Sequence, residues 1–259
     1  MNTSPLDHGR LRRRVAAGET TLGTFIGAAS AVTGEVCAAA GMDWLLLDLE
    51  HGAGGEEQLR SLVPAAAAYG VPVVVRVESA DRIRIGRALD LGAAGIMLPR
   101  LDSVEDVATA LRHLRYPPDG DRGVATYNRA CRFGLDPGAL DRADHDVLGV
   151  VQIESAAAVE DVDKIAMLDG VDVVFVGPRD LSHDLGVPGE FTAPAYVAAL
   201  DRVRSAAQAA GKACGLLVND GAAAADRVAE GWTFVAIGSD SILLAAAVAG
   251  HLARARSGA

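Results

Sequence analysis

The stretch Val147-Leu148-Gly149-Val150-Val151-Gln152-Ile153-Glu154 is apolar almost throughout and ends in a carboxylate. A second stretch, Val171-Asp172-Val173-Val174-Phe175-Val176-Gly177-Pro178-Arg179, leads in the same way to Asp180. Neither stretch alternates apolar and polar residues, as a strand with one solvent-exposed face would. Both therefore indicate parallel strands buried on both faces. Each run therefore predicts a buried strand with an acidic residue at its end.

The same order of apolar run, loop and amphipathic stretch continues along the chain. The predicted strands are Leu22–Gly27, Trp44–Leu49, Val71–Val77, Gly95–Leu101, Val147–Ile153, Val171–Val176, Cys214–Val218 and Phe234–Gly238. The predicted helices are Ala31–Ala40, Gly55–Ala68, Asp81–Leu91, Ser103–Leu114, Ala156–Leu168, Ala193–Ala210, Gly221–Ala229 and Ser241–Ala255. Eight such units predict an α/β protein with a single (β/α)8 barrel, the TIM-barrel architecture. A doubly wound open sheet is the alternative, because alternation alone does not prove closure.

We predict one domain over residues 1–259, because no low-complexity linker interrupts the chain. One segment, Tyr116–Asp146, breaks the alternation and is long, polar and rich in Arg, Gly and Asp. A loop of this length in a compact domain is usually functional or mobile. The alternative is a surface excursion that packs on a neighbouring subunit.

Composition narrows the classes of partner. The net charge is −10 and aromatic residues make up 4% of the chain, which argues against binding nucleic acid or an anionic membrane. The one cationic cluster, Arg10-Leu11-Arg12-Arg13-Arg14, is predicted to be a solvated first helix. No apolar run is long enough to span a bilayer, and the polar N-terminus predicts no signal peptide.

The cysteines indicate the compartment. Cys37, Cys131 and Cys214 are three in number and widely spaced. Such a set is typical of reduced thiols and predicts a cytoplasmic protein.

Glu154 and Asp180 are the candidate metal ligands. The carboxyl ends of barrel strands meet at one face, where barrel enzymes carry their catalytic residues. Two carboxylates on adjacent strand ends make an oxygen-rich site that suits Mg²⁺ or Mn²⁺ and leaves positions for water and a chelating substrate. The alternative is that each carboxylate caps the helix that follows it.

His51 is the candidate general acid or base, because the intrinsic pKa of histidine lies near neutrality. Asp48, three residues earlier, can orient its imidazole, and Asp90 is a second candidate for that role. The alternative for His51 is a histidine on a surface loop.

Arg76 lies on an otherwise apolar strand. A buried arginine needs an anionic partner, so one interpretation is a structural ion pair. The other is a cation that polarises a substrate carbonyl or stabilises an enolate oxygen. The junction from Gly177 to Asp180 offers backbone amides that can hold a carboxylate, or it is an ordinary strand-to-helix turn.

Taken together, these motifs resemble the HpcH/HpaI aldolase family of class II, metal-dependent pyruvate aldolases. The residues that carry the resemblance are Trp44–His51, Val75-Arg76, Met97–Arg100, Tyr116–Val124, Val151–Glu154 and Val176–Ser182. They occur in the same order over roughly residues 10–250. The resemblance implies a barrel of the phosphoenolpyruvate/pyruvate-binding type. It also implies cleavage of a 4-hydroxy-2-keto acid to pyruvate and an aldehyde.

The resemblance further implies the roles of individual residues. Glu154 and Asp180 would hold Mg²⁺, Mn²⁺ or Co²⁺, to which the pyruvate enolate is bound. Arg76 would stabilise the enolate oxygen, and Gln152 would position the pyruvate unit. The backbone amides of Gly177 and Arg179 would receive its carboxylate. His51, oriented by Asp48, would transfer the proton of the aldol hydroxyl.

Some positions differ from better-known members of that family. Phe25 stands where a tryptophan often lines the pocket, and Arg179 stands where some members have alanine. Leu217 matches a position that affects the aldehyde side. The family commonly forms hexamers built from trimers, with the last helix exchanged between subunits. A homo-oligomer, trimer or hexamer, is therefore expected.

Two other functions stay open. A relative that cleaves a CoA thioester, such as malyl-CoA or citramalyl-CoA, would need a nucleotide-binding surface, which Arg122, Arg129 and Arg132 can supply as a basic rim. A non-catalytic barrel that binds keto acids is the third possibility.

Overall fold

A computed structural model describes residue 7 and residues 9–257, and its strands close into a barrel in the order β1-β2-β3-β4-β5-β6-β7-β8. The strands are β1 (Thr21–Ile26), β2 (Trp44–Asp48), β3 (Val73–Arg76), β4 (Gly95–Leu98), β5 (Leu148–Ile153), β6 (Val173–Val176), β7 (Ala213–Val218) and β8 (Phe234–Ser239). All pairs are parallel, and β8 pairs with β1. The predicted barrel is confirmed, and the open-sheet alternative is wrong. The ends of the predicted domain, residues 1–6, 8 and 258–259, lie outside the described residues.

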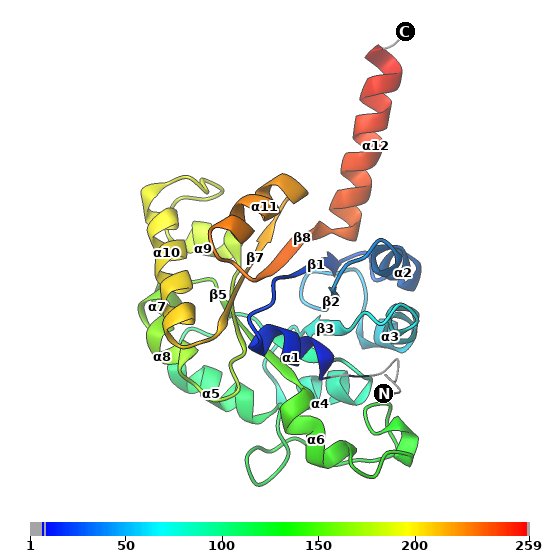
Figure 1. Ribbon diagram of the computed structural model, residues 1–259. Coiled ribbons are helices and arrows are strands. Elements are labelled where there is room, and N and C mark those ends of the chain that lie inside the picture. Colours follow the sequence, from blue (N-terminus) through cyan, green and yellow to red (C-terminus); the bar gives the residue numbers. More distant parts are fainter. Residues whose placement is uncertain (1–6, 8, 258–259) are drawn as a thin grey trace.

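Helices surround the barrel (Figure 1). They are α1 (Arg10–Ala16), α2 (Ala31–Ala39), α3 (Leu59–Ala67), α4 (Arg82–Asp90), α5 (Val104–Arg112), α6 (Ala139–Asp146), α7 (Ala156–Glu160), α8 (Val162–Ala166), α9 (Pro178–Asp184), α10 (Pro194–Ala209), α11 (Gly221–Ala229) and α12 (Asp240–Ser257), with 3-10 turns η1 (Glu56–Gln58) and η2 (Arg132–Gly134). The helix predicted over Ala156–Leu168 is divided into α7 and α8, and α6 and α9 were not among the predicted helices.

The core has two layers that follow from the two-residue period of the strands. Side chains of one parity, such as Leu45 and Leu47 of β2, pack outward against the helices. Those of the other parity, such as Trp44 and Leu46, fill the barrel interior, where Trp44 stacks on Phe234 with ring centres 4.2 Å apart. The inward parity continues to Asp48, so the end of β2 directs a carboxylate toward the barrel axis.

The same inward parity brings the other polar side chains to the axis. Arg76 follows Val74 on β3, and Gln152 follows Leu148 and Val150 on β5. In β2, β3 and β5, the inward-facing apolar residues fill the amino-terminal part of the barrel. The inward-facing polar residue follows them toward the carboxyl end of the strand. The chemistry-bearing side chains therefore gather at the carboxyl ends of the strands, as barrel enzymes require.

Helix α1 covers the opposite end of the barrel (Figure 1). Its Leu11 and Val15 are buried in the interior cluster. Arg12 donates to Asp172 at 3.0 Å and to the Asp144 carbonyl at 2.6 Å. The predicted first helix is confirmed, but its basic residues do not simply face solvent, because Arg12 ties α1 to the start of β6.

The segment Tyr116–Asp146 lies at the same amino-terminal end, because it joins α5 to β5. It is not structureless, since it contains η2 and α6. Its Tyr116 and Cys131 are buried, whereas Tyr127 and Leu135 are more than 80% exposed. The segment therefore lies at the end of the barrel opposite the carboxyl ends of the strands.

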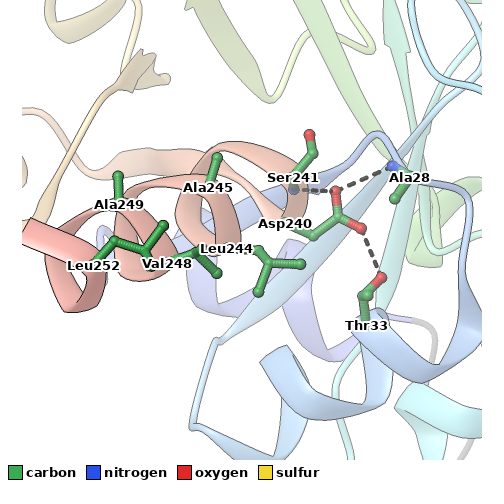
Figure 2. Close-up of a pocket in the computed structure, with 9 residues that line it drawn as sticks. All are labelled: Ala28, Thr33, Asp240, Ser241, Leu244, Ala245, Val248, Ala249 and Leu252. Carbon is green, nitrogen blue, oxygen red and sulfur yellow. Dashed lines mark hydrogen bonds between the residues drawn. The ribbon is translucent and has the colours of Figure 1, made fainter. Parts of the chain in front are cut away.

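Helix α12 projects from the barrel beside α2 (Figure 1). Of its residues, only Asp240 is buried, while Ile242, Leu244, Val248 and Leu252 are about half exposed or more. An apolar groove of about 480 Å³ runs along it and reaches Ala28 and Thr33 (Figure 2). In the described part of the chain, no helix combines the length and the apolar character needed to cross a membrane.

Candidate active site

Two carboxylates hold Arg76 at the end of the barrel formed by the carboxyl ends of the strands, here called the barrel mouth. Its Nε and Nη2 donate to Asp48 at 2.9 and 2.7 Å, and its Nη1 lies 3.1 Å from Glu50 Oε2. Asp48 and Arg76 are register partners on β2 and β3, so strand alignment alone brings them together. The guanidinium carbon also lies 5.4 Å from the ring centre of Phe25 on β1. The ion pair that a buried arginine requires is present.

Asp48 contacts the backbone of His51 rather than its imidazole. Its Oδ1 accepts from the amides of Glu50 and His51 at 3.1 and 3.2 Å. Burial alone would raise the pKa of Asp48, but the hydrogen bonds and charge of Arg76, with the two amides, leave that pKa lowered. The predicted contact between Asp48 and the imidazole is therefore replaced by one that fixes the loop carrying it.

The imidazole of His51 reaches toward solvent. Its side chain is 64% exposed, and its Nε2 lies 3.9 Å from Glu50 Oε2. A proton donor or acceptor at this place is free to meet a substrate that enters from the mouth. The surface-loop interpretation of His51 describes its exposure, and Glu50 lies between its imidazole and the guanidinium of Arg76.

Glu154 is clamped through both carboxylate oxygens. Oε1 accepts from the backbone amide of Arg100 at 2.7 Å, and Oε2 accepts from Gln152 Nε2 at 3.1 Å. A Cβ at Gly177 would lie 2.5 Å from Glu154 Oε2, so only glycine leaves room for this carboxylate. The glycine at the end of β6 is thus part of how Glu154 is positioned.

The Glu154 carboxyl resists ionisation. Burial, and then the charges of Asp180 and Glu50, raise its pKa to about 7, against the opposing effects of the Arg100 amide and Arg76. Asp180 is less enclosed, with 44% of its side chain exposed. Both carboxylates line a cavity of about 330 Å³. Two acidic groups that repel one another at one cavity wall form a place where a cation is stabilised.

The helix-capping alternative is wrong for both carboxylates. The cap of α7 is Ser155, whose side chain accepts from the Ala158 amide at 3.1 Å. The cap position of α9 is Gly177, and Asp180 lies inside the first turn. Neither Glu154 nor Asp180 is needed to begin the helix after its strand.

The Gly177 amide is already engaged. It donates to the Ile153 carbonyl at 3.2 Å, so it is not free to receive a substrate carboxylate as predicted. The amide of Arg179 belongs to the first turn of α9, where backbone donors lack intrahelical acceptors. The Arg179 guanidinium stacks over Phe191 at 5.3 Å, so its charge is directed toward that ring.

The two apolar residues of the predicted pocket, Phe25 and Leu217, occupy inward-facing positions on their strands. Phe25 is 5% exposed and packs edge-on against Phe175, with ring centres 6.3 Å apart. Leu217, near the end of β7, is partly buried against the interior cluster. Phe25 supports Arg76 from within the barrel, and Leu217 lies at the rim.

The donor set fits a hard divalent cation. Glu154 and Asp180 supply oxygen ligands, and no cluster of three or more metal-binding side chains occurs among residues 9–257. The buried Gln152 Oε1 has no hydrogen-bond partner among the described residues. A hydrated ion of the Mg²⁺ type keeps several waters, and one of these can donate to that oxygen.

Glu50 and Arg100 contribute more than the sequence indicated. The sequence motifs assign a role to neither residue. Glu50 shares the parity of Asp48 and completes the ion pair of Arg76. Arg100 adopts a left-handed backbone with φ 50° and directs its amide at Glu154. The parity was readable in advance, but the backbone conformation of Arg100 was not, because nothing local marks a non-glycine residue for positive φ.

The three arginines predicted to form a basic rim, Arg122, Arg129 and Arg132, do not lie around the candidate active site. Arg122 is 2% exposed and pairs with Asp90 at 2.8 Å. Asp90 is thereby engaged at the end of α4 and does not orient His51. Arg129 and Arg132 belong to the segment at the amino-terminal end of the barrel. The surface proposed for a CoA nucleotide therefore lies on the opposite face from Glu154.

The chain is similar to known proteins over nearly its whole length. Residues 21–247 match the family described as HpcH/HpaI aldolase/citrate lyase. A "4-hydroxy-2-oxovalerate aldolase" of Rhodococcus jostii (strain RHA1) is 41% identical over 90% of this chain and 91% of its own. A "2-keto-3-deoxy-L-rhamnonate aldolase" of Klebsiella pneumoniae is 36% identical over 98% and 94%. A crystal structure of a protein of this family from Burkholderia cenocepacia J2315 is similar with a TM-score of 0.92 at 36% identity, covering 96% and 99%.

Proposed function

Because the chain belongs to the HpcH/HpaI aldolase/citrate lyase family and its relatives are carbon–carbon lyases, we propose that it is a divalent-metal-dependent pyruvate aldolase. It reversibly cleaves a 4-hydroxy-2-keto acid to pyruvate and an aldehyde. The observation that carries the proposal is the meeting of Glu154, Asp180 and the ion-paired Arg76 at one end of the barrel.

Glu154 and Asp180 would hold Mg²⁺, Mn²⁺ or Co²⁺, all of which accept oxygen ligands. When bound there, the ion supplies Lewis acidity to the ketone oxygen of the substrate and helps orient the keto acid. The Arg100 amide and Gln152 hold the Glu154 carboxylate in place for this task.

Arg76 stabilises the negative charge that develops on the ketone oxygen. As the bond between carbons 3 and 4 breaks, its electron pair moves toward carbon 2 and the ketone becomes an enolate. A preorganised cation is effective here because it needs no reorientation during the reaction. Asp48 and Glu50 provide that preorganisation by fixing the guanidinium from two sides.

His51 takes the proton of the 4-hydroxyl during cleavage and returns it during synthesis. The electrons of that O–H bond form the aldehyde carbonyl, so the products are the aldehyde and the pyruvate enolate, which a proton then converts to pyruvate. Asp48 keeps the His51 backbone fixed, and Phe25 and Leu217 form the apolar wall. The amide of Arg179, in the first turn of α9, would receive the substrate carboxylate.

The other functions have less support. The CoA-thioester lyase would need a basic rim that binds the nucleotide, but Arg122 is buried at the opposite end of the barrel. The keto-acid-binding barrel without catalysis does not explain a paired cation and an exposed histidine beside two clustered carboxylates.

We also propose a homo-oligomer, trimer or hexamer, in which a second copy covers α12. The support is the run of exposed apolar side chains along this helix, including Leu244 and Val248. A cytoplasmic location is proposed because Cys37, Cys131 and Cys214 are all unpaired.

Proton exchange at the methyl group of pyruvate in D₂O, followed by NMR, tests the proposal without knowledge of the aldehyde. We expect exchange with Mg²⁺ or Mn²⁺, loss of exchange in EDTA, and at least a hundredfold loss in Glu154→Ala. The matched control is Asp184→Asn, which lines the same cavity but accepts a hydrogen bond from the Ala156 amide at 2.6 Å. It should retain exchange within about threefold. A folded wild-type protein that shows no exchange with any divalent ion would refute the proposal.

A further inference from the structure

Asp240 is a buried carboxylate that the proposed reaction does not use. It is the first residue of α12 and is 5% exposed. Burying a carboxylate is costly unless hydrogen bonds satisfy it. What Asp240 contacts therefore indicates what it does.

The carboxylate of Asp240 fastens the loop between β1 and α2 to α12 (Figure 2). Its Oδ1 accepts from the amides of Gly27 and Ala28 at 3.0 and 3.1 Å, and from the Ser241 amide of its own helix at 2.8 Å. Its Oδ2 accepts from the Thr33 hydroxyl at 2.6 Å. Hydrogen bonds to an ionised acceptor are roughly twice as strong as neutral ones.

The loop held by Asp240 in turn holds the loop that carries His51. The Ala53 amide donates to the Gly27 carbonyl at 2.8 Å. The two loops also pack closely, since a Cβ at Gly54 would lie 2.3 Å from the Ala29 Cβ. A continuous path of contacts thus leads from α12 through Gly27 to the residues beside His51.

We propose that Asp240 is a positioning residue for His51, and that the seating of α12 and the position of the His51 loop are coupled through it. The inference rests on the proposed role of His51 for its catalytic consequence, but not for the structural coupling. Asp48 fixes one end of this loop from β2, and Asp240, acting through Gly27, fixes the other.

Removing the carboxylate should release the loop. In Asp240→Ala the buried amides of Gly27 and Ala28 lose their acceptor, which favours local opening. In Asp240→Asn the side-chain oxygen can still accept from those amides, and the Thr33 hydroxyl can accept from the new amide. The asparagine variant should therefore restore much of what alanine loses.

Amide hydrogen exchange over residues 49–55 tests the coupling directly. We expect exchange about tenfold faster in Asp240→Ala and less than threefold faster in Asp240→Asn. The matched control is Asp220→Ala, which removes an exposed aspartate that caps α11 by accepting from the Ala223 amide at 2.9 Å. Exchange over 49–55 should be unchanged there. Unchanged exchange in folded Asp240→Ala would overturn the proposal. If that variant does not fold, Asp240→Ser is measured instead, because its shorter side chain cannot reach both the Gly27 and Ala28 amides, and unchanged exchange there would overturn the proposal equally.

A kinetic comparison gives the functional readout. With 4-hydroxy-2-oxovalerate as probe, Asp240→Ala should lower the kcat of cleavage about tenfold more than it lowers pyruvate methyl exchange, because only cleavage needs His51. Equal losses in both reactions would indicate a merely structural role and contradict the proposal. Absence of methyl exchange in the wild type would instead refute the aldolase function, while the hydrogen-exchange result would still decide the coupling.

Discussion

Arg76 combines two properties that are hard to obtain together, a fixed charge and an apolar surrounding. Its side chain is 10% exposed, and the guanidinium faces Phe25 on one side and the carboxylates of Asp48 and Glu50 on the others. Removing one partner of such a pair is costly because a buried charge is left uncompensated. The stability of the barrel mouth and the reactivity of its cation therefore depend on the same few atoms.

Asp48→Asn should lower the free energy of unfolding by about 3 kcal/mol at pH 7. Because the pKa of Asp48 is lowered in the folded protein, its contribution is fully present above the unfolded pKa. It is lost as the pH falls through the folded pKa. Urea unfolding should therefore show a constant gap between wild type and variant above about pH 5 that narrows below about pH 4. A gap that widens in acid would contradict the ion-pair assignment.

Gly177→Ala should displace the Glu154 carboxylate, because the new methyl group would lie 2.5 Å from Oε2 and 3.1 Å from Gln152 Nε2. We expect Mn²⁺ affinity, measured by electron paramagnetic resonance, to fall about tenfold or more. Gly221→Ala is the matched control, since it stands at the corresponding strand-to-helix junction after β7 with open space around it. It should bind Mn²⁺ as the wild type does, and equal binding by both variants would count against the placement of Glu154.

At this scale the sequence predicted which side chains meet but not how they bond. The apolar runs and their final polar residues place Asp48, Arg76 and Glu154 at one face, because parity and strand ends are local properties. The partner of Asp48 is not local: Arg76 lies 28 residues away and meets it through strand register. Proximity in sequence favoured His51 as that partner, and the register brings Arg76 instead.

Among the elements, α1 is a helix with a basic sequence that nevertheless packs two side chains into the core. Its arginines surround Leu11 and Val15, which close the interior cluster at the amino-terminal end. The sequence predicted the helix but not its buried face, because two large apolar residues in seven give little periodicity. Helix α6, with the sequence Ala139–Asp146, was missed for a similar reason, since none of its residues is buried.

Leu11→Ala should lower the free energy of unfolding by about 3 kcal/mol through the cavity it leaves in the barrel. Methyl exchange by the folded variant should stay within about twofold of the wild type, since α1 lies at the end away from the site. Arg13→Ala, whose side chain is 58% exposed, is the control and should change stability by less than about 0.5 kcal/mol. Thermal unfolding measures both, and a stable Leu11→Ala protein would contradict the packing of α1 on the core.

For the whole molecule, the order and closure of the barrel were predictable because eight similar units leave few other topologies. The position of α12 was not, because a helix with exposed apolar residues has no place within one chain that the sequence specifies. Its contacts within the chain are made chiefly by its first residues, around Asp240.

The double substitution Leu244→Asp with Val248→Asp should shift the protein toward smaller species in sedimentation velocity. Both side chains line the apolar groove of α12, and charge there opposes burial against a second copy. Met167→Asp, at a side chain that is 70% exposed beyond α8, is the control and should leave the sedimentation coefficient unchanged. An unchanged coefficient in the double variant would count against assembly through α12.

The placement of the Tyr116–Asp146 segment has a practical consequence. It emerges at the barrel end remote from Glu154, and its exposed Tyr127 and Leu135 make no contribution to the cavity. A chemical handle attached here would tether the protein to a resin or an electrode with its mouth turned outward. Substrate would then reach every immobilised molecule, whereas attachment at Arg100 or His183 would block the opening it needs.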